Sequence, residues 1–195
     1  MATVKSNVKT FLAKVAQGVK PNMFEVGIKF PTAVAAGDAG LPNILCKSAA
    51  LPASSIGTIE VPFRGRTVKI AGDRTFDNWT ATFVNDKDMK IRAYFEKWLN
   101  LMNSHEGNIA TGFNPTATDN TGYTVPITVT QLEKNSDEYG TDLRKYKLHY
   151  AFPASVSQID LAYDSNDQIE EFSVEFQYSY WTIEKAKDAT LEFVA

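Results

Sequence analysis

Cysteine, histidine and surplus positive charge are all scarce in this chain of 195 residues. Cys46 is its single cysteine, which excludes a disulfide within the chain and zinc sites built on two or four cysteines. The two histidines, His105 and His149, lie far apart, and their spacing indicates neither a metal site nor a Ser-His-Asp triad. Twenty Lys and Arg against 23 Asp and Glu give a net charge of −3, which argues against tight nucleic-acid binding because such affinity comes largely from neutralised phosphates.

Long apolar runs and nucleotide-binding motifs are also missing. No stretch approaches the roughly 18 consecutive apolar residues of a membrane-spanning helix, and the N-terminal segment lacks the apolar core of a signal peptide. Neither GxGxxG nor GxxxxGK followed by Ser or Thr occurs. We therefore expect a soluble protein that folds in a cytoplasm, without membrane insertion and with no cofactor or metal.

Alternating apolar and polar residues dominate the rest of the sequence, and its length favours one domain over residues 1–195. We expect strands within residues 23–30, 44–51, 59–63, 68–70, 79–83, 125–132, 143–152, 156–163 and 169–181. The run from Phe172 to Tyr180 alternates without a break, which is typical of a strand with one buried and one wet face.

Two segments have helical periodicity instead. Residues 86–105 carry an apolar stripe that we interpret as core packing, capped by Asp86 or Asp88: Ile91, Tyr94, Phe95, Trp98, Leu99 and Met102. Residues 4–15 predict a short amphipathic helix, which either docks on another surface or frays on its own domain. The whole pattern predicts a mainly β fold, a sandwich or barrel of antiparallel strands flanked by one α-helix plus a short N-terminal helix.

Charged residues gather between positions 64 and 77. Arg64 and Arg66 flank a glycine at the tip of a predicted hairpin, and Asp73, Arg74 and Asp77 follow it. Two carboxylates suffice for glycoside hydrolysis on a β scaffold, but a neighbouring cation lowers a carboxyl pKa, whereas a general acid needs a raised pKa. We interpret the cluster as a salt-bridged turn or a subunit interface, and we expect no enzymatic activity.

The segment AGDRTFDNWTATFVND, residues 71–86, resembles a recurring signature of the tail tube proteins of contractile-tailed bacteriophages (the myovirus tail tube family). Other strings match that family in the same order, over roughly residues 4–181: PNMFEV at 21–26, CKSAALPA at 46–53, GN at 107–108, LAYDSNDQIEEF at 161–172 and YW at 180–181. The loop at 31–42 is longer than the family pattern. Residues 182–195 run past its Tyr-Trp end, so we treat them as a C-terminal extension of a single tail-tube domain.

This resemblance implies a structural virion protein whose stacked hexameric rings make the inner tail tube, the conduit for DNA ejection through a contractile tail. The implied partners are other copies of the chain and the tail sheath, baseplate, tape-measure and tail-terminator proteins, with assembly in the host bacterial cytoplasm. DNA would pass through without specific binding. One alternative is the tube of a phage-derived contractile injection particle, and an alternative of a different class is a carbohydrate-active β-sandwich.

Two sets of residues are candidates for roles in such an assembly. We expect the hairpin at 57–72 to reach a neighbouring ring. The acid–base cluster then either binds the incoming hairpin or holds the base of the hairpin in place. The alternative is a solvated hairpin with local salt bridges. The subunit-interface candidates are thus Arg64, Arg66, Asp73, Arg74 and Asp77. A polar lumen would not retain DNA phosphates, and the lumen-lining candidates on the last predicted strand are Glu171, Ser173, Glu175 and Gln177. Whether that face is luminal or sheath-facing stays open.

Overall fold

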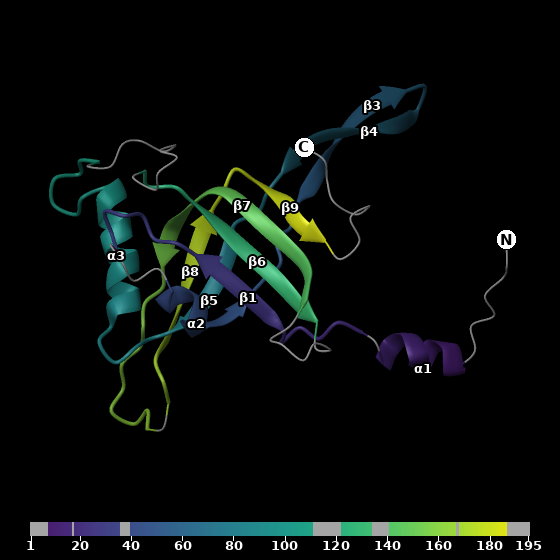
Figure 1. Cartoon of the computed structure of the whole chain (residues 1–195). Helices are drawn as coiled ribbons and strands as arrows, with labels where there is room; N and C mark the ends of the chain where they lie inside the picture. Colours follow the sequence, from purple (N-terminus) through teal and green to yellow (C-terminus); the bar gives the residue numbers. More distant parts are fainter. Residues whose placement is uncertain are drawn as a thin grey trace.

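The computed structural model describes residues 8–16, 18–35, 40–110, 122–133, 141–166 and 168–186, which form a two-layer β-sandwich with three helices (Figure 1). The helices are α1 (Val8–Ala16), α2 (Leu41–Leu45) and α3 (Lys90–Met102). The strands are β1 (Phe24–Ile28), β2 (Cys46–Ala49), β3 (Ser55–Phe63), β4 (Arg66–Thr75), β5 (Trp79–Val84), β6 (Val125–Glu133), β7 (Thr141–Val156), β8 (Glu171–Gln177) and β9 (Tyr180–Ala186).

The two sheets share their longest strand, β7. One sheet has the order β1-β6-β7-β9 and the other β7-β8-β5-β2, with antiparallel pairing throughout. Tyr150 has a φ of 58° between His149, which pairs with β9, and Phe152, which pairs with β8. A left-handed residue that falls out of the ladder in this way bends the strand as a β-bulge, and here it carries β7 from one sheet into the other.

The sandwich is open rather than closed into a barrel. Within the described ranges, β1 pairs with β6 and β2 pairs with β5, but β1 and β2 do not pair with each other. The predicted mainly β fold is therefore confirmed in its sandwich form. β1 and β2 are thus edge strands, and α2 covers part of the β1 edge, where the Ile28 backbone N–H donates to Asn43 Oδ1 at 2.8 Å.

The core between the sheets and α3 is rich in aromatic rings. Alternation along β5 and β8 buries six side chains: Trp79, Ala81, Phe83, Phe172, Val174 and Phe176. From α3, the Phe95 ring centroid lies 5.1 Å from that of Phe83 and 5.9 Å from that of Phe176. Burying each such ring stabilises the fold by roughly 1.5–3 kcal/mol, so this contact holds α3 along the sandwich (Figure 1).

A helix within the predicted span 86–105 is confirmed as α3; its N-cap position is Met89, and Asp86 caps the first turn from three residues upstream. The Asp86 carboxylate oxygen Oδ1 accepts a hydrogen bond from the Ile91 backbone N–H at 3.1 Å, whereas the Asp88 carboxylate lies 3.5 Å from Lys90 Nζ. Ile91, Phe95 and Trp98 are the buried members of the apolar stripe. None of the helices in the described part of the chain is long and apolar enough to cross a membrane.

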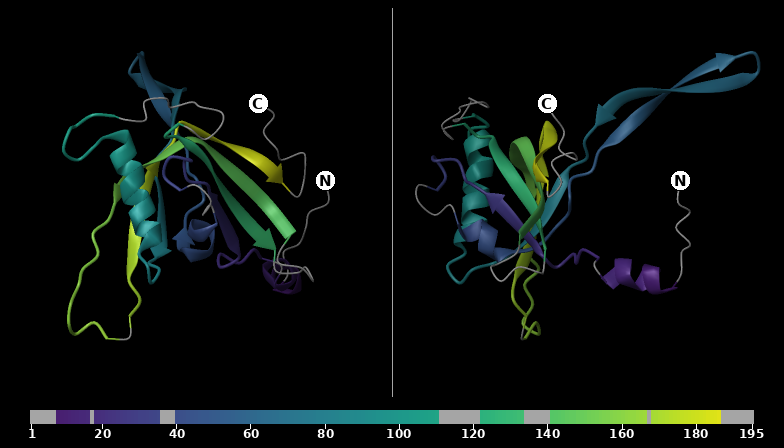
Figure 2. Two further views of the ribbon diagram at one scale, coloured as in Figure 1. Left: turned by 60° about the vertical axis from the view of Figure 1, so that its left-hand side comes forward. Right: turned by 45° about the vertical axis from the view of Figure 1, so that its right-hand side comes forward.

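Two elements stand away from the sandwich (Figure 2). β3 and β4 form a separate two-stranded sheet that extends from the body as a long hairpin, as the sequence predicted. The N-terminal helix α1 leaves its apolar side chains uncovered, with Val8, Phe11, Leu12 and Val15 between 56% and 74% exposed. Of the predicted span 4–15, residues 4–7 lie outside the described residues.

Three sequence expectations need correction. The predicted fold had two helices, but α2 is a third, in a segment that we assigned to a loop and the start of a strand. The strand predicted at 156–163 is wrong, because β7 ends at Val156. The Ser157 backbone N–H still donates to the Ser173 carbonyl oxygen, but among the described residues no strand pairs with the segment that follows. The span 169–181 is two strands, because the chain turns at Ser179 and enters β9, which belongs to the other sheet. The predicted extension thus begins inside β9, and residues 187–195 lie outside the described residues.

Candidate functional site

The β3–β4 hairpin, which we call the hairpin arm (residues 55–75), ends in a tight turn carrying two arginines. Arg64 and Gly65 occupy the turn with φ values of 46° and 79°, a left-handed pair that favours glycine at its second position. The Arg64 guanidinium carbon lies 5.4 Å from the Phe63 ring centroid, and Arg66 opens β4 directly opposite Phe63. Both predicted tip residues therefore lie together at the exposed end of the arm.

The hairpin arm has one apolar face and one polar face. Opposed residues share a face, and the pairs Ile59 with Ile70 and Val61 with Val68 continue into Phe63. These five side chains are between 43% and 62% exposed. On the reverse face Glu60 pairs with Lys69, whose Nζ lies 3.4 Å from the carboxylate. A contiguous apolar strip of this kind is typical of an interaction surface.

The acid–base cluster lies at the base of the hairpin arm. Arg74 Nη1 donates a 3.4 Å hydrogen bond to Ser54 Oγ, and Ser55 and Thr75 hydroxyls meet at 2.7 Å across the two strands. Within the part of the chain that the structure describes, no ion pair joins Asp73, Arg74 and Asp77. Burial and the Asp77 carboxylate together raise the pKa of Tyr178. The three charges lie near one another without a salt bridge between them.

The lumen candidates line the outer face of β8. Glu171 forms an ion pair with Lys47 of β2 at 2.5 Å. Glu175 accepts a hydrogen bond from Asn78 Nδ2 at 2.7 Å and another from Ser155 Oγ at 3.2 Å. Ser173 Oγ meets Thr82 Oγ1 at 3.2 Å, and Gln177 is exposed at the strand end. The structure therefore brings the four candidates onto one polar, hydrogen-bonded surface, because the buried Phe172, Val174 and Phe176 alternate with them.

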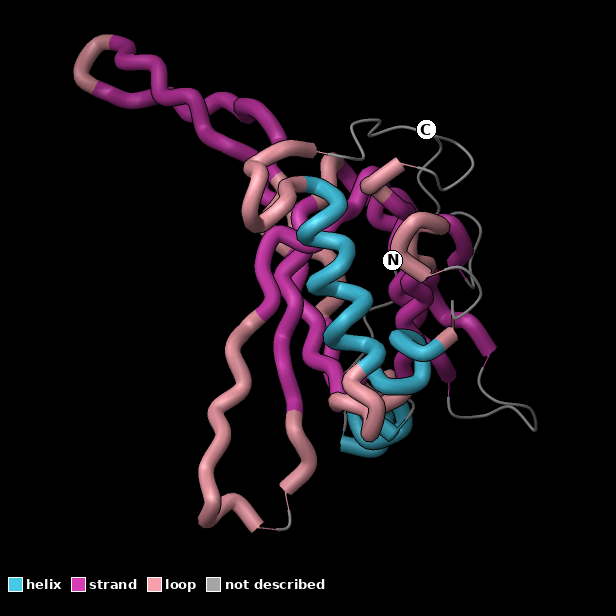
Figure 3. The backbone as a smooth tube through the Cα atoms, turned by 90° about the vertical axis from the view of Figure 1, so that its left-hand side faces the viewer, coloured by secondary structure: helices cyan, strands magenta, loops and turns pink. Residues whose placement is uncertain are grey.

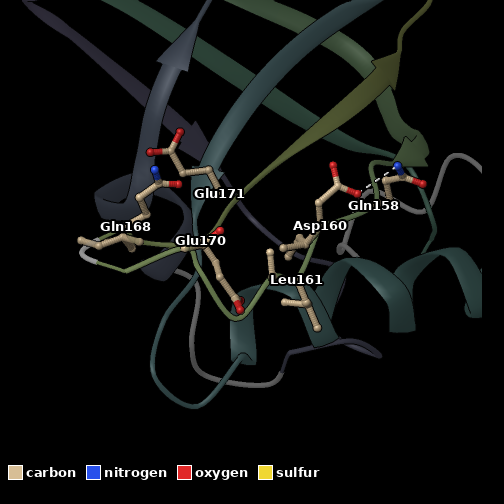
Figure 4. A pocket seen from close by; sticks show the side chains of 10 residues that line it. Gln158, Asp160, Leu161, Gln168, Glu170 and Glu171 are labelled. Atoms are coloured by element: carbon tan, nitrogen blue, oxygen red, sulfur yellow. Dashed lines mark hydrogen bonds between the residues drawn. The ribbon is translucent and has the colours of Figure 1, made fainter.

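A cavity that the sequence did not predict lies in the loop between β7 and β8; we call its described residues, 157–166 and 168–170, the distal loop. The cavity has a volume of about 640 Å³, and its carboxylates come from Asp160, Glu170 and Glu171 (Figure 4). Asp160 accepts a hydrogen bond from Gln158 Nε2 at 3.3 Å, and Glu170 accepts one from Asn85 Nδ2 at 3.0 Å. The residues were visible in the sequence, but the wrong strand at 156–163 hid the loop that gathers them.

The distal loop and the hairpin arm lie at opposite ends of the subunit (Figure 3). All three views share a vertical axis, and in each the hairpin arm is at the top and the distal loop at the bottom. Three large side chains of the loop are more than two-thirds exposed: Leu161 at 80%, Tyr163 at 108% and Ile169 at 72%. The molecule thus has uncovered apolar surface at both ends.

The histidines occupy ordinary structural positions. The His149 ring stacks on Tyr180 with centroids 4.5 Å apart, and its Nε2 lies 2.8 Å from Thr182 Oγ1. Burial, aided by Lys147 and opposed by Glu184, lowers the pKa of His149. His105 Nδ1 lies 2.9 Å from Asn100 Oδ1. Over the described ranges, no three His, Cys, Asp or Glu side chains are grouped so as to hold a metal ion.

Comparison with known proteins gives consistent relatives. Residues 19–184 match the protein family described as phage tail tube protein. The tail tube protein gp19 of Enterobacteria phage T4 is 32% identical over 162 residues, which are 83% of this chain and 90% of that protein. The tail tube protein of Serratia phage KSP90 is 26% identical over 160 residues, 82% of this chain and 85% of that protein.

Solved structures with this fold come from contractile systems. A chain in the structure of the sheath/tube terminator of the extracellular contractile injection system PVC, in its extended state, aligns with a TM-score of 0.59 at 19% identity, over 86% of this chain and 97% of that one. A chain in the structure of the anti-feeding prophage cap, which terminates the tube, aligns with a TM-score of 0.58 at 17% identity, over 95% and 100%. At these identities the likeness concerns the fold.

Proposed function

The chain belongs to the phage tail tube protein family, and from this premise we propose that it assembles into stacked hexameric rings forming the inner tube of a contractile tail. The family consists of structural tail proteins rather than enzymes, and its members are components of the virion tail. The tube would conduct DNA during ejection. The resemblance that the signature at 71–86 indicated is confirmed at the level of the family.

The observation that carries the proposal is the hairpin arm, a sheet held outside the core with an uncovered apolar face. In a free subunit the five apolar side chains of the arm stay about half exposed, so apolar surface remains that only another molecule can bury. Covering that face by another subunit in a head-to-tail contact that does not close would build a filament. β1 and β2 are edge strands with no strand on their outer side among the described residues, which supports lateral contacts within a ring.

We place the polar outer face of β8 toward the lumen. Duplex DNA slides through a channel that offers it few cations, because each basic contact releases counterions and adds affinity. On this face the single ion-paired cation is Lys47, while Glu171, Ser173, Glu175 and Gln177 contribute neutral or acidic groups. A cysteine at position 177 should therefore be shielded from bulky reagents in assembled tubes.

The proposed partners follow from the place of a tube inside a tail. The solved structures that share the fold include a sheath/tube terminator, a tube cap and a baseplate complex, which supports contacts with tail sheath, baseplate, tape-measure and tail-terminator proteins. We propose assembly in the host bacterial cytoplasm. Because that fold also serves injection systems, a tube of a DNA-free injection particle is a second candidate; terminase and capsid genes beside this gene would exclude it.

Electron microscopy of the concentrated, purified protein tests the proposal. We expect hollow tubes of stacked rings, alone or with baseplate added as a nucleus. Protein that stays strictly monomeric under both conditions would contradict it.

Charge reversal at the arm tip tests the stacking contact. The Arg64→Glu, Arg66→Glu double variant should remain folded, since both residues lie in or beside an exposed turn, but should form no tubes. A matched control reverses two exposed body lysines that form no ion pair among the described residues, Lys20→Glu with Lys29→Glu. Unchanged tube length and yield in the tip variant would refute the role of the arm.

A further inference from the structure

Resting on the proposed function, we infer that the hairpin arm of one copy docks on the distal loop of a second copy in the adjoining ring, with Arg64 and Arg66 in its acidic cavity. The inference names the receiving surface, which the sequence had left to the Asp73, Arg74 and Asp77 cluster. It stands on three matches between the two ends of the molecule: position, apolar surface and charge.

The positions suit a head-to-tail contact. The hairpin arm leaves one end of the subunit, and the distal loop closes the other end (Figures 1 and 3). Copies stacked in the same orientation bring the arm of one against the distal loop of the next. The acid–base cluster lies at the base of the arm and thus at the same end of the subunit as the arm. In a stack of copies with one orientation, the arm of the neighbouring copy arrives at the other end, so it does not reach this cluster.

The apolar surfaces match as well. The arm offers a strip of five side chains on one face, and the distal loop offers Leu161, Tyr163 and Ile169, which are among its most exposed residues. All of these side chains keep a large exposed fraction in the free subunit, from 43% at Val61 upward. Contact between the two surfaces removes both from water at once.

The charges match one to one. Within the described chain, neither Arg64 nor Arg66 forms an ion pair. In the cavity, Lys47 already neutralises Glu171, whereas Asp160 and Glu170 accept hydrogen bonds from the neutral side chains of Gln158 and Asn85. Two guanidinium groups therefore meet two carboxylates without a cation of their own. Pairs of this kind also fix orientation, because a guanidinium can bind a carboxylate through two parallel hydrogen bonds.

The space is adequate for this contact. The cavity of about 640 Å³ is open at the surface, and its walls combine Asp160 and Glu170 with Leu161 and Ile169. Phe63 lies against the Arg64 guanidinium, so the tip presents an aromatic ring and a cation together. The tip and the cavity thus share the same mixture of apolar and charged groups.

Crosslinking of mixed single-cysteine variants tests the contact in assembled tubes. Thr67→Cys marks the arm beside its tip, and Ser165→Cys marks the cavity wall, without removing a charge or an apolar contact. Burial raises the pKa of the Cys46 thiol to about 11 despite its hydrogen bond to the Ser48 carbonyl, so the native cysteine contributes little background. The competing partner for the arm is the exposed apolar face of α1, and Ala16→Cys marks the edge of that face, one helical turn after Leu12.

We expect a short bismaleimide to join Thr67→Cys to Ser165→Cys at least roughly ten-fold more than Thr67→Cys to Ala16→Cys, because contact raises the effective concentration. Tubes in which the arm is joined to α1 instead would overturn this inference and leave the proposed function intact. Wild-type protein that gives neither tubes nor crosslinks would overturn both.

Charge exchange tests the ion pairs. Asp160→Arg with Glu170→Arg should block tube formation as the tip reversal does, since like charges now face each other. The quadruple variant that combines both reversals should restore tubes, because the attraction returns with its sign exchanged. Thermal unfolding of each variant shows whether the subunit is folded. A quadruple variant that is folded but does not polymerise, beside double variants that polymerise normally, would refute the pairing.

Discussion

Asp86 lies just before α3, and its carboxylate accepts the backbone N–H of Ile91 at 3.1 Å. Slight burial raises the pKa of this carboxyl, but hydrogen bonds from backbone amides, led by those of Ile91 and Lys90, outweigh it and lower the pKa below the ordinary 3.8. The ionised form is therefore favoured by folding. Its stabilisation is complete above the ordinary carboxyl pKa and is lost as the pH falls through the lowered value of the folded state.

Replacing this cap should destabilise the subunit in a pH-dependent way. At neutral pH, Asp86→Ala should lower the free energy of unfolding by about 1 kcal/mol, and Asp86→Asn by less, because the amide oxygen still accepts a hydrogen bond. The difference between wild type and the alanine variant should shrink below pH 3.8, measured by urea unfolding at several pH values. A difference that does not change with pH would show that the ionised carboxylate has no part in the cap.

At the scale of elements, the hairpin arm is separable from the sandwich. It forms its own sheet, and none of its residues belongs to the buried core. Gly72 lies close to its base, where an added Cβ would come within 3.2 Å of the Gly57 carbonyl oxygen. The two glycines thus approach each other closely where the arm joins the body, and the arm can be truncated at this point.

Removal of the arm should uncouple folding from assembly. Replacing residues 58–71 by an Asn-Gly turn should leave the midpoint of thermal unfolding nearly unchanged and abolish tubes in electron micrographs. Phe95→Ala is the contrasting control, since loss of a buried ring should cost about 3–5 kcal/mol. Destabilisation of the armless variant to a similar extent would show that the arm supports the fold.

The sequence predicted those elements whose signals are local. The Arg64-Gly65-Arg66 turn, the alternation around Trp79 and the apolar stripe of α3 are contained within short windows, and the structure confirms them. α2 has five residues and includes a proline in its first turn, too short for a helical period to show. The distal cavity depends on Asn85 and Lys47, which are distant in sequence from the loop, so local patterns could not reveal it.

At the scale of the whole molecule, the outer faces of the two sheets differ in the charged groups that they carry. The outer face of β8 carries acidic and neutral groups with one paired lysine. On the other sheet, Lys145 and Lys147 both lie near the Glu184 carboxylate, at 3.0 and 3.5 Å, so two lysines share one carboxylate in this cluster. A ring whose lumen passes DNA is better served by the first face.

Labelling of assembled tubes tests this orientation. A bulky PEG-maleimide should react with Lys147→Cys and not with Gln177→Cys, while a small maleimide should reach both through the open lumen. Disassembled subunits of both variants should react with either reagent, which controls for local burial. Protection of position 147 with free reaction at 177 would place the opposite sheet against the lumen.

The two-faced hairpin arm also restricts how its length can vary among viruses. Because side chains alternate, one extra residue in each strand would turn the tip, and both arginines with it, to the opposite side of the ribbon. Two extra residues restore the side and lengthen the arm by about 7 Å. If the arm makes the proposed stacking contact, insertions and deletions that preserve it should come in even steps per strand, and the spacing between rings should then change in increments.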